Sequence, residues 1–183
     1  MHDSSTPGIR PRPTLRRRLD AVSRRAFPAV CTALVVLLAG VPFGVPGGAG
    51  LRSAAALGCV FFWSLVRPAS MTPPAVFLLG ALCDLLGLSP PGVAVLVLLV
   101  AHGLAVRWGP VLAPRGFAAV WLAFAAVAAG AAALEWALTG LLTWRLPPPG
   151  AAVLQALLAI GVYPVLAVPF IRAHRGPAAP ELA

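Results

Sequence analysis

Apolar residues fill long stretches of the chain from about Pro28 onward, separated by short breaks rich in proline and glycine. About 20 helical residues, at 1.5 Å each, cross a hydrocarbon core of roughly 30 Å. Proline and glycine end helices, so the breaks predict short connections. The apolar stretches lie at about 28–46, 51–66, 73–88, 92–108, 116–143 and 151–171. The pattern predicts an all-α polytopic membrane protein, with a six-helix transmembrane bundle at 28–171.

The stretches 51–66 and 73–88 are short for membrane spans, so a re-entrant hairpin must be weighed against two spans with local thinning of the bilayer. Arginine accumulates on the cytoplasmic side of membranes, and its distribution separates the two arrangements. With six spans and a cytoplasmic N-terminus, only Arg52 and Arg145 of the fourteen arginines lie outside. If the third stretch does not cross the membrane, nine arginines lie on the cytoplasmic side and five lie outside. Six spans with both termini in the cytoplasm is therefore the better arrangement.

The charge of the chain is concentrated in its N-terminal tail, residues 1–27. Only 10% of all residues are charged and 60% are hydrophobic, whereas an ordinary soluble domain has about 25% charged residues. The formal net charge is +9, and half of the fourteen basic residues precede the first apolar stretch. This uneven distribution favours a tail lying against anionic lipid over a surface that binds nucleic acid. The tail arginines are Arg10, Arg12, Arg16, Arg17, Arg18, Arg24 and Arg25.

Within the tail, Leu15, Leu19 and Val22 recur at helical spacing among arginines. This spacing is typical of a basic amphipathic helix in the membrane interface, here at 14–26, and the proline-rich residues before it predict disorder. The sequence SRRAF resembles a twin-arginine export signal, but such a signal leads a hydrophilic cargo, and further apolar stretches follow here. We expect an uncleaved tail, and a second cytoplasmic tail at 172–183.

Residues that could perform catalysis are scarce. The sequence has no phosphate-binding loop, dinucleotide fingerprint, GxSxG or HExxH motif. Cys31, Cys59 and Cys83 fall within predicted spans without metal-ligand spacing, so we interpret them as small packing residues. His102, in the fourth stretch, is interpreted as hydrogen-bonded to a neighbouring helix, with a proton relay as the lesser alternative. We therefore expect no enzyme activity, no metal and no cofactor.

A carboxylate at the centre of a transmembrane helix costs roughly 2.5–3.5 kcal/mol, so it usually faces the bundle interior with a partner. Asp84 is such a residue. Gly80, Asp84 and Gly87 share one helix face, which lets another helix approach closely while Asp84 bonds to it. We predict that Asp84 is buried inside the bundle or at a partner-helix contact, and is held by a hydroxyl, a backbone group or His102. Binding of a substrate or a proton is the rival interpretation.

Glu135 is the second carboxylate within a predicted span. The stretch 116–143 is longer than the hydrocarbon core requires, so tilt and snorkelling would bring this side chain to the outer interface. Trp136 and Trp144 would lie beside it there. We interpret Glu135 as a near-interface residue.

The stretch VRPASMTPPAVFLLGALCDLLGLSPPGVAVLVLLVAH, Val66 to His102, resembles the signature region of MreD, a family of small rod shape-determining membrane proteins. That family has an Arg-Pro after the second span, a Phe-Leu-x-Gly-x-x-x-Asp-Leu-Leu helix, a Pro-Leu-Gly turn and another apolar helix. The C-terminal QALLAIGVYPVLAVPFIRAHR, with Tyr163 and Pro164, is similar to the family's last span. Matching signature positions are Arg67, Pro68, Phe77, Leu78, Gly80, Asp84, Leu85, Leu86, Pro91 and Gly92.

Two departures concern the loops. The turn reads Pro90-Pro91-Gly92 in place of Pro-Leu-Gly, and SMT stands at 70–72 where an acidic residue is common in the family.

The resemblance implies a non-enzymatic subunit of the wall-elongation machinery in the bacterial cytoplasmic membrane. Its partners would be MreC, the MreB filament and the elongation-specific peptidoglycan synthase pair. We expect MreC to be met through membrane helices and brief loops, since the stretch at Ala125 to Ala133 is rich in alanine and glycine and allows close packing.

MreD-like proteins are also similar, in their six-helix arrangement, to the substrate-binding S components of energy-coupling factor transporters. This similarity supplies an alternative function, a vitamin-type binding subunit of an uptake transporter. Such a pocket needs several converging hydrogen-bonding groups. The outer half of the predicted bundle offers few, which favours the scaffold: Asp84, Glu135, Thr139, Thr143 and Gln155.

Overall fold

The computed structural model describes residues 15–40, 48–87 and 90–175, and within these ranges it is all-α, as predicted. Predictions about residues 1–14, 41–47, 88–89 and 176–183 lie outside the described residues. The elements are α1 (Leu15–Ala39), α2 (Gly48–Val66), α3 (Pro73–Leu86), α4 (Val93–Leu112), the 3₁₀ turn η1 (Ala113–Arg115), α5 (Gly116–Thr143) and α6 (Pro149–Arg175).

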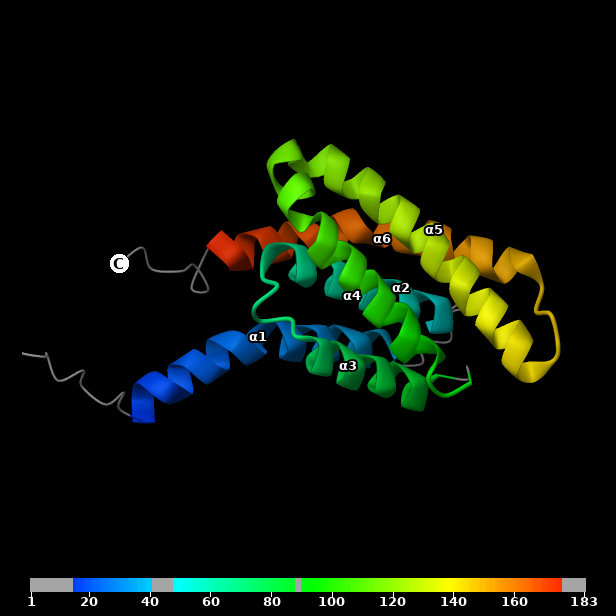
Figure 1. Ribbon diagram of the computed structural model, residues 1–183, viewed down its shortest axis with the longest axis horizontal. Coiled ribbons are helices and arrows are strands. Elements are labelled where there is room, and N and C mark those ends of the chain that lie inside the picture. The colour runs from blue at the N-terminus through cyan, green and yellow to red at the C-terminus, as the bar shows by residue number, and fades with distance from the viewer. Residues whose placement is uncertain (1–14, 41–47, 88–89, 176–183) are drawn as a thin grey trace, which may run out of the picture.

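Successive helices run in opposite directions along the long axis of the molecule (Figure 1). The first residues of α2, α4 and α6 therefore lie at the same end of the bundle as the last residues of α3 and α5, at the right in the view. We call this the α4-start end. The opposite end holds the connection from α2 to α3 and the η1 turn between α4 and α5. Helix starts carry a partial positive charge and helix ends a partial negative one, so the α4-start end favours a carboxylate beside a helix start and a cation beside a helix end.

Helix α2 is the centre of the bundle, with α1, α4 and α6 packed around it. Its residues from Ala54 to Ser64 are continuously buried, as expected for a helix that is apolar on every side. Aromatic rings join three helices in this core. The ring of Tyr163 stacks on Phe124 with centroids 4.2 Å apart, and Phe61 of α2 packs against both rings.

Helix α1 differs from the sequence-based expectation. An interfacial helix at 14–26 and a separate span from about 28 were predicted, but a single helix runs from Leu15 to Ala39 with Pro28 inside it. The helix continues through Pro28, and the Thr32 hydroxyl donates to the proline's own carbonyl at 2.8 Å, one helical turn away. Pro28 therefore does not separate two elements.

Two helical stretches are long and apolar enough to cross a membrane, Val93–Thr143, which contains both α4 and α5, and Pro149–Ala167. Three further helices are apolar but shorter, at Arg25–Ala39, Gly50–Val66 and Pro73–Leu86. The α4 helix passes through Pro110 and ends at Leu112, four residues beyond the predicted end of the fourth stretch. The described chain is thus a helical bundle with segments suited to a membrane.

Candidate functional site

Helices α3 and α4 form a hairpin whose close contact depends on Gly80. A Cβ atom at this position would lie 2.5 Å from the Cα of Val95 and 2.9 Å from its backbone nitrogen. Real Cβ atoms do not approach backbone atoms this closely. Gly80 therefore allows the two backbones to pack at a distance that any larger residue would prevent. The hairpin is completed at Gly92, whose positive φ of 95° is a conformation that glycine adopts readily.

One turn after Gly80, the carboxylate of Asp84 lies at the start of α4. Its Oδ2 accepts the Gly92 N–H at 2.8 Å and the Val95 N–H at 3.5 Å, and its Oδ1 accepts the Ala94 N–H at 3.0 Å. The first N–H groups of a helix have no partners within it, and a negative charge at that end is favourable. Asp84 thus caps α4 from the neighbouring helix.

The surroundings of Asp84 differ from the prediction in the extent of burial and agree with it in the kind of donor. The side chain is half-buried, not enclosed within the bundle, because the start of α4 lies near the end of the molecule. Its donors are backbone N–H groups, one of the three kinds predicted. His102 is not among them, since it lies more than two helical turns further along α4 and pairs with α2.

Arg52 of α2 provides the complementary contact at the other side of the hairpin. Its guanidinium donates to the carbonyl of Leu86, the last residue of α3. Unpaired carbonyls end every helix, and a cation there is favourable for the same electrostatic reason that an anion is at the start. Arg52 therefore caps α3. From the sequence, Arg52 is predicted only to lie on the outer side of the membrane, because no local pattern connects it to Leu86.

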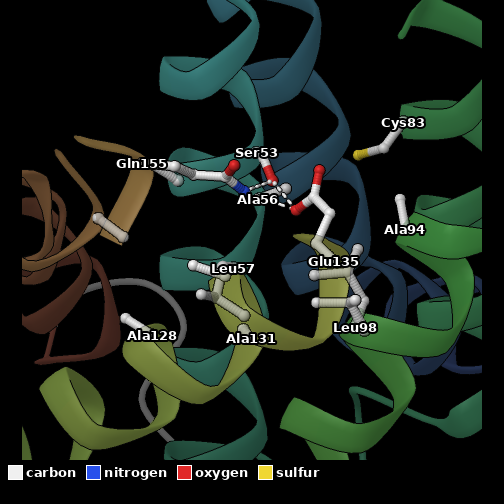
Figure 2. A pocket seen from close by; sticks show the side chains of 14 residues that line it. Ser53, Ala56, Leu57, Cys83, Ala94, Leu98, Ala128, Ala131, Glu135 and Gln155 are labelled. Carbon is white, nitrogen blue, oxygen red and sulfur yellow. Dashed lines mark hydrogen bonds between the residues drawn. The ribbon is translucent and has the colours of Figure 1, made fainter. Parts of the chain in front are cut away.

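A second polar cluster joins α2, α5 and α6 near the same end of the bundle (Figure 2). Glu135 Oε2 accepts from the Gln155 amide at 2.6 Å and from the Ser53 hydroxyl at 3.3 Å, and the same amide nitrogen donates to Ser53 Oγ at 2.9 Å. We call these three half-buried residues the polar triad. Ser53 was not a predicted site residue; a serine in an apolar stretch was its only signal.

Glu135 therefore points toward α2 and α6, and its place near the membrane interface stays a prediction. It lies eight residues before the end of α5, a depth of about 12 Å at 1.5 Å per residue. Neither Trp136 nor Trp144 belongs to the polar triad. Trp136 donates its indole N–H to the Pro147 carbonyl at 2.8 Å, and Trp144 is 89% exposed.

The polar triad lines a small cavity whose other walls are mostly alanine and leucine side chains. Its volume is about 20 Å³, enough for one water molecule, which needs roughly 10–15 Å³. A drug-sized or vitamin-sized ligand needs about 300–1,000 Å³. In the described geometry the polar triad can hold a water molecule and connect three helices.

His102 is buried and shares a hydrogen bond of 2.8 Å between its Nδ1 and the Ser64 hydroxyl of α2. This contact lies deep in the bundle, away from Asp84 and Glu135. Both groups satisfy each other across the α2–α4 contact, so the geometry accounts for a histidine in an apolar helix.

The remaining predicted site residues do not converge. The Arg67 carbonyl accepts the Ser70 and Met71 N–H groups in the turn that follows α2, with Pro68 exposed beside it. Phe77 is 52% exposed on α3, and Gly87 caps the same helix. Pro91 is exposed in the turn before α4, and Tyr163 and its neighbour Pro164 lie in α6.

Among the described residues, no three histidine, cysteine or acidic side chains are grouped so that they could hold a metal ion. Cys31, Cys59 and Cys83 are free thiols, and the last two are buried. These positions are compatible with packing roles.

No known family, curated protein or solved structure matches this chain. The likeness to MreD therefore rests on the motifs of Val66 to His102 and of the last helix.

Proposed function

We propose that the chain is a non-enzymatic scaffold subunit of the cell-wall elongation complex, which helps to maintain rod shape and organise lateral peptidoglycan synthesis. The observation that carries the proposal is the α3–α4 hairpin. Among the signature residues, Gly80 allows the close contact of the two helices and Asp84 caps α4. Gly92 forms the turn between them. The motif that resembles MreD thus corresponds to one structural device in this chain.

The proposal includes six spans with both termini in the cytoplasm of a bacterial cell. The α4-start end would then face outward, and the η1 turn inward. Reporters fused after Gly48, Ser89 and Pro148 should be active outside, and those after Met71 and Pro110 inside. An externally active reporter after Pro110 contradicts this orientation.

The proposed partners are MreC first, and through it MreB and the synthase pair. Membrane helices would supply the contacts, because the described connections between helices are short. The test is co-purification in detergent from cells at natural expression levels, with MreC and the synthase pair as the expected proteins. An unrelated six-span protein with the same affinity tag serves as the control. Recovery of transporter ATPases instead would overturn the assignment.

One observation favours the alternative, a vitamin-type binding subunit: Ser53, Glu135 and Gln155 converge on a cavity. The cavity volume of about 20 Å³ weighs against it, since a vitamin needs more than ten times that space. Mass spectrometry of the purified chain distinguishes the two functions. A stoichiometric vitamin would establish the alternative, whereas its absence together with bound MreC supports the scaffold.

The decisive functional experiment is complementation. A strain that lacks its native rod-shape subunit should recover rod shape when it expresses this chain. An empty vector and the Gly80→Leu variant are the controls, because leucine cannot fit between α3 and α4. Recovery by Gly80→Leu at a normal membrane level would contradict the link between the hairpin and the function.

A further inference from the structure

An apolar groove of about 220 Å³ lies between α4 and α5. Its α4 wall includes Val97, Val100 and Trp108, and its α5 wall includes Ala126 and Gly130. Val100 and Trp108 are more than 40% exposed, and a Cβ atom at Gly130 would meet no atom within 4 Å. The groove is thus open to the surroundings of the bundle, and Gly130 leaves additional room in it.

The dimensions of the groove suit one hydrocarbon chain. A cavity of about 150 Å³ already accommodates benzene. From Trp108 to Val97 the groove follows eleven residues of α4, about 16 Å at 1.5 Å per residue, which is half of a core of roughly 30 Å. Tryptophan is enriched at the membrane interface. If Trp108 marks that level, Val97 lies near the midplane, so the groove is one leaflet deep.

The end of the groove marked by Trp108 is basic. Arg107 precedes Trp108, and Arg115 lies in the η1 turn that joins the two walls. Both side chains are exposed, and neither makes an ion pair or hydrogen bond with another described residue. No acidic residue occurs between Asp84 and Glu135. Asp84 bonds to the start of α4 and Glu135 to Gln155 near the start of α6, so both lie toward the α4-start end. Among the side chains that the structure describes, none pairs with the positive charge at the turn.

We propose that an anionic phospholipid of the inner leaflet binds here, with its phosphate on Arg107 and Arg115 and one acyl chain in the groove. Basic pockets between membrane helices on the cytoplasmic side are suited to such headgroups. The inference rests on the proposed orientation of the η1 turn, but it is independent of MreC and of rod shape.

The test uses the full chain purified in detergent and supplied with phosphatidylglycerol, cardiolipin or phosphatidylcholine with the same acyl chains. Native mass spectrometry should show preferential retention of the two anionic lipids. The double variant Arg107→Gln/Arg115→Gln should lower their affinity by about thirty-fold, from the loss of two arginines near an anionic headgroup. Gly130→Leu should reduce retention of all acyl-chain lipids at this site, because leucine fills the groove.

Two matched variants provide the controls. Arg145→Gln removes an exposed arginine from the connection after α5, and Gly161→Leu fills open space on α6 outside the groove. Both should retain lipid as the unaltered chain does. The proposal is overturned if phosphatidylcholine is retained equally, if the groove and control variants behave alike, or if photo-crosslinking from position 130 captures a partner helix and no lipid. Failure of the orientation alone would appear in the reporter fused after Pro110, and failure of the scaffold function in the co-purification.

Discussion

The carboxylate of Asp84 accepts the Gly92 N–H at 2.8 Å across the turn between α3 and α4. Two more backbone N–H groups of α4 point at the same carboxylate. The side chain of one helix thus supplies the acceptors that the start of the next helix lacks.

We predict an order of stability at this position: the native aspartate, then Asp84→Asn, then Asp84→Leu. Asparagine keeps one acceptor oxygen, but its NH₂ group cannot accept an N–H. Leucine leaves every donor unpaired, at a cost of about 1–3 kcal/mol. Thermal unfolding of the purified variants measures the order. In cells at matched membrane levels, rod shape should decline in the same order. If both variants abolish rod shape equally while unfolding as the native chain does, the packing role of Asp84 is wrong.

The second prediction concerns Gly80→Ala. The added methyl group would lie 2.5 Å from the Cα of Val95, so the α3 and α4 backbones must separate. Overpacking of this kind costs about 1–3 kcal/mol. The matched control is Gly103→Ala on α4, where a Cβ atom meets nothing within 4 Å and alanine favours the helix by about 1 kcal/mol. The unfolding temperature should fall for the first variant and stay equal or rise for the second. A fall of the same size in both would show that loss of glycine, not the close contact, is responsible.

The polar triad leads to a third prediction. Gln155 donates to Glu135 at 2.6 Å, whereas Ser53 donates at 3.3 Å. Gln155→Leu should therefore lower the free energy of unfolding by about 1–3 kcal/mol, since Glu135 loses its closer donor. Ser53→Ala should cost less, because the amide remains. Denaturant unfolding in detergent gives both values, and a greater loss for Ser53→Ala would contradict the assigned order of the contacts.

Local patterns explain how much of this fold could be predicted. The lengths of the apolar stretches and the proline and glycine breaks predict helices, and the i, i+4 spacing of Gly80 and Asp84 predicts a shared face. The all-α class follows from those features. The position of Pro28 inside a continuous helix could not be predicted. Proline usually marks a helix boundary, and only its surroundings decide whether it is tolerated within a helix.

The polar triad could not be predicted for a different reason. Ser53 is 82 residues from Glu135 and 102 from Gln155, so no periodicity connects them. Their meeting depends on how α2, α5 and α6 pack. Asp84 is an intermediate case: its partner Gly92 is only eight residues away. The turn geometry places the start of α4 beside Asp84, and backbone groups are among the donors that the sequence predicts for it.

The last prediction separates a structural His102 from a proton relay. His102 and Ser64 are buried and satisfy each other at 2.8 Å. Ser64→Ala and His102→Leu should each leave the other polar group unpaired, but the double variant leaves neither. The double variant should therefore lose less stability than the two single variants together, by about 0.5–3 kcal/mol. Ser64→Ala combined with Ser53→Ala is the control pair, and its effects should add within about 0.5 kcal/mol because the two serines share no partner. The Ser64→Ala/His102→Leu double variant should also preserve rod shape if it accumulates normally in the membrane. Loss of shape with normal accumulation and stability would instead assign His102 a role in proton transfer.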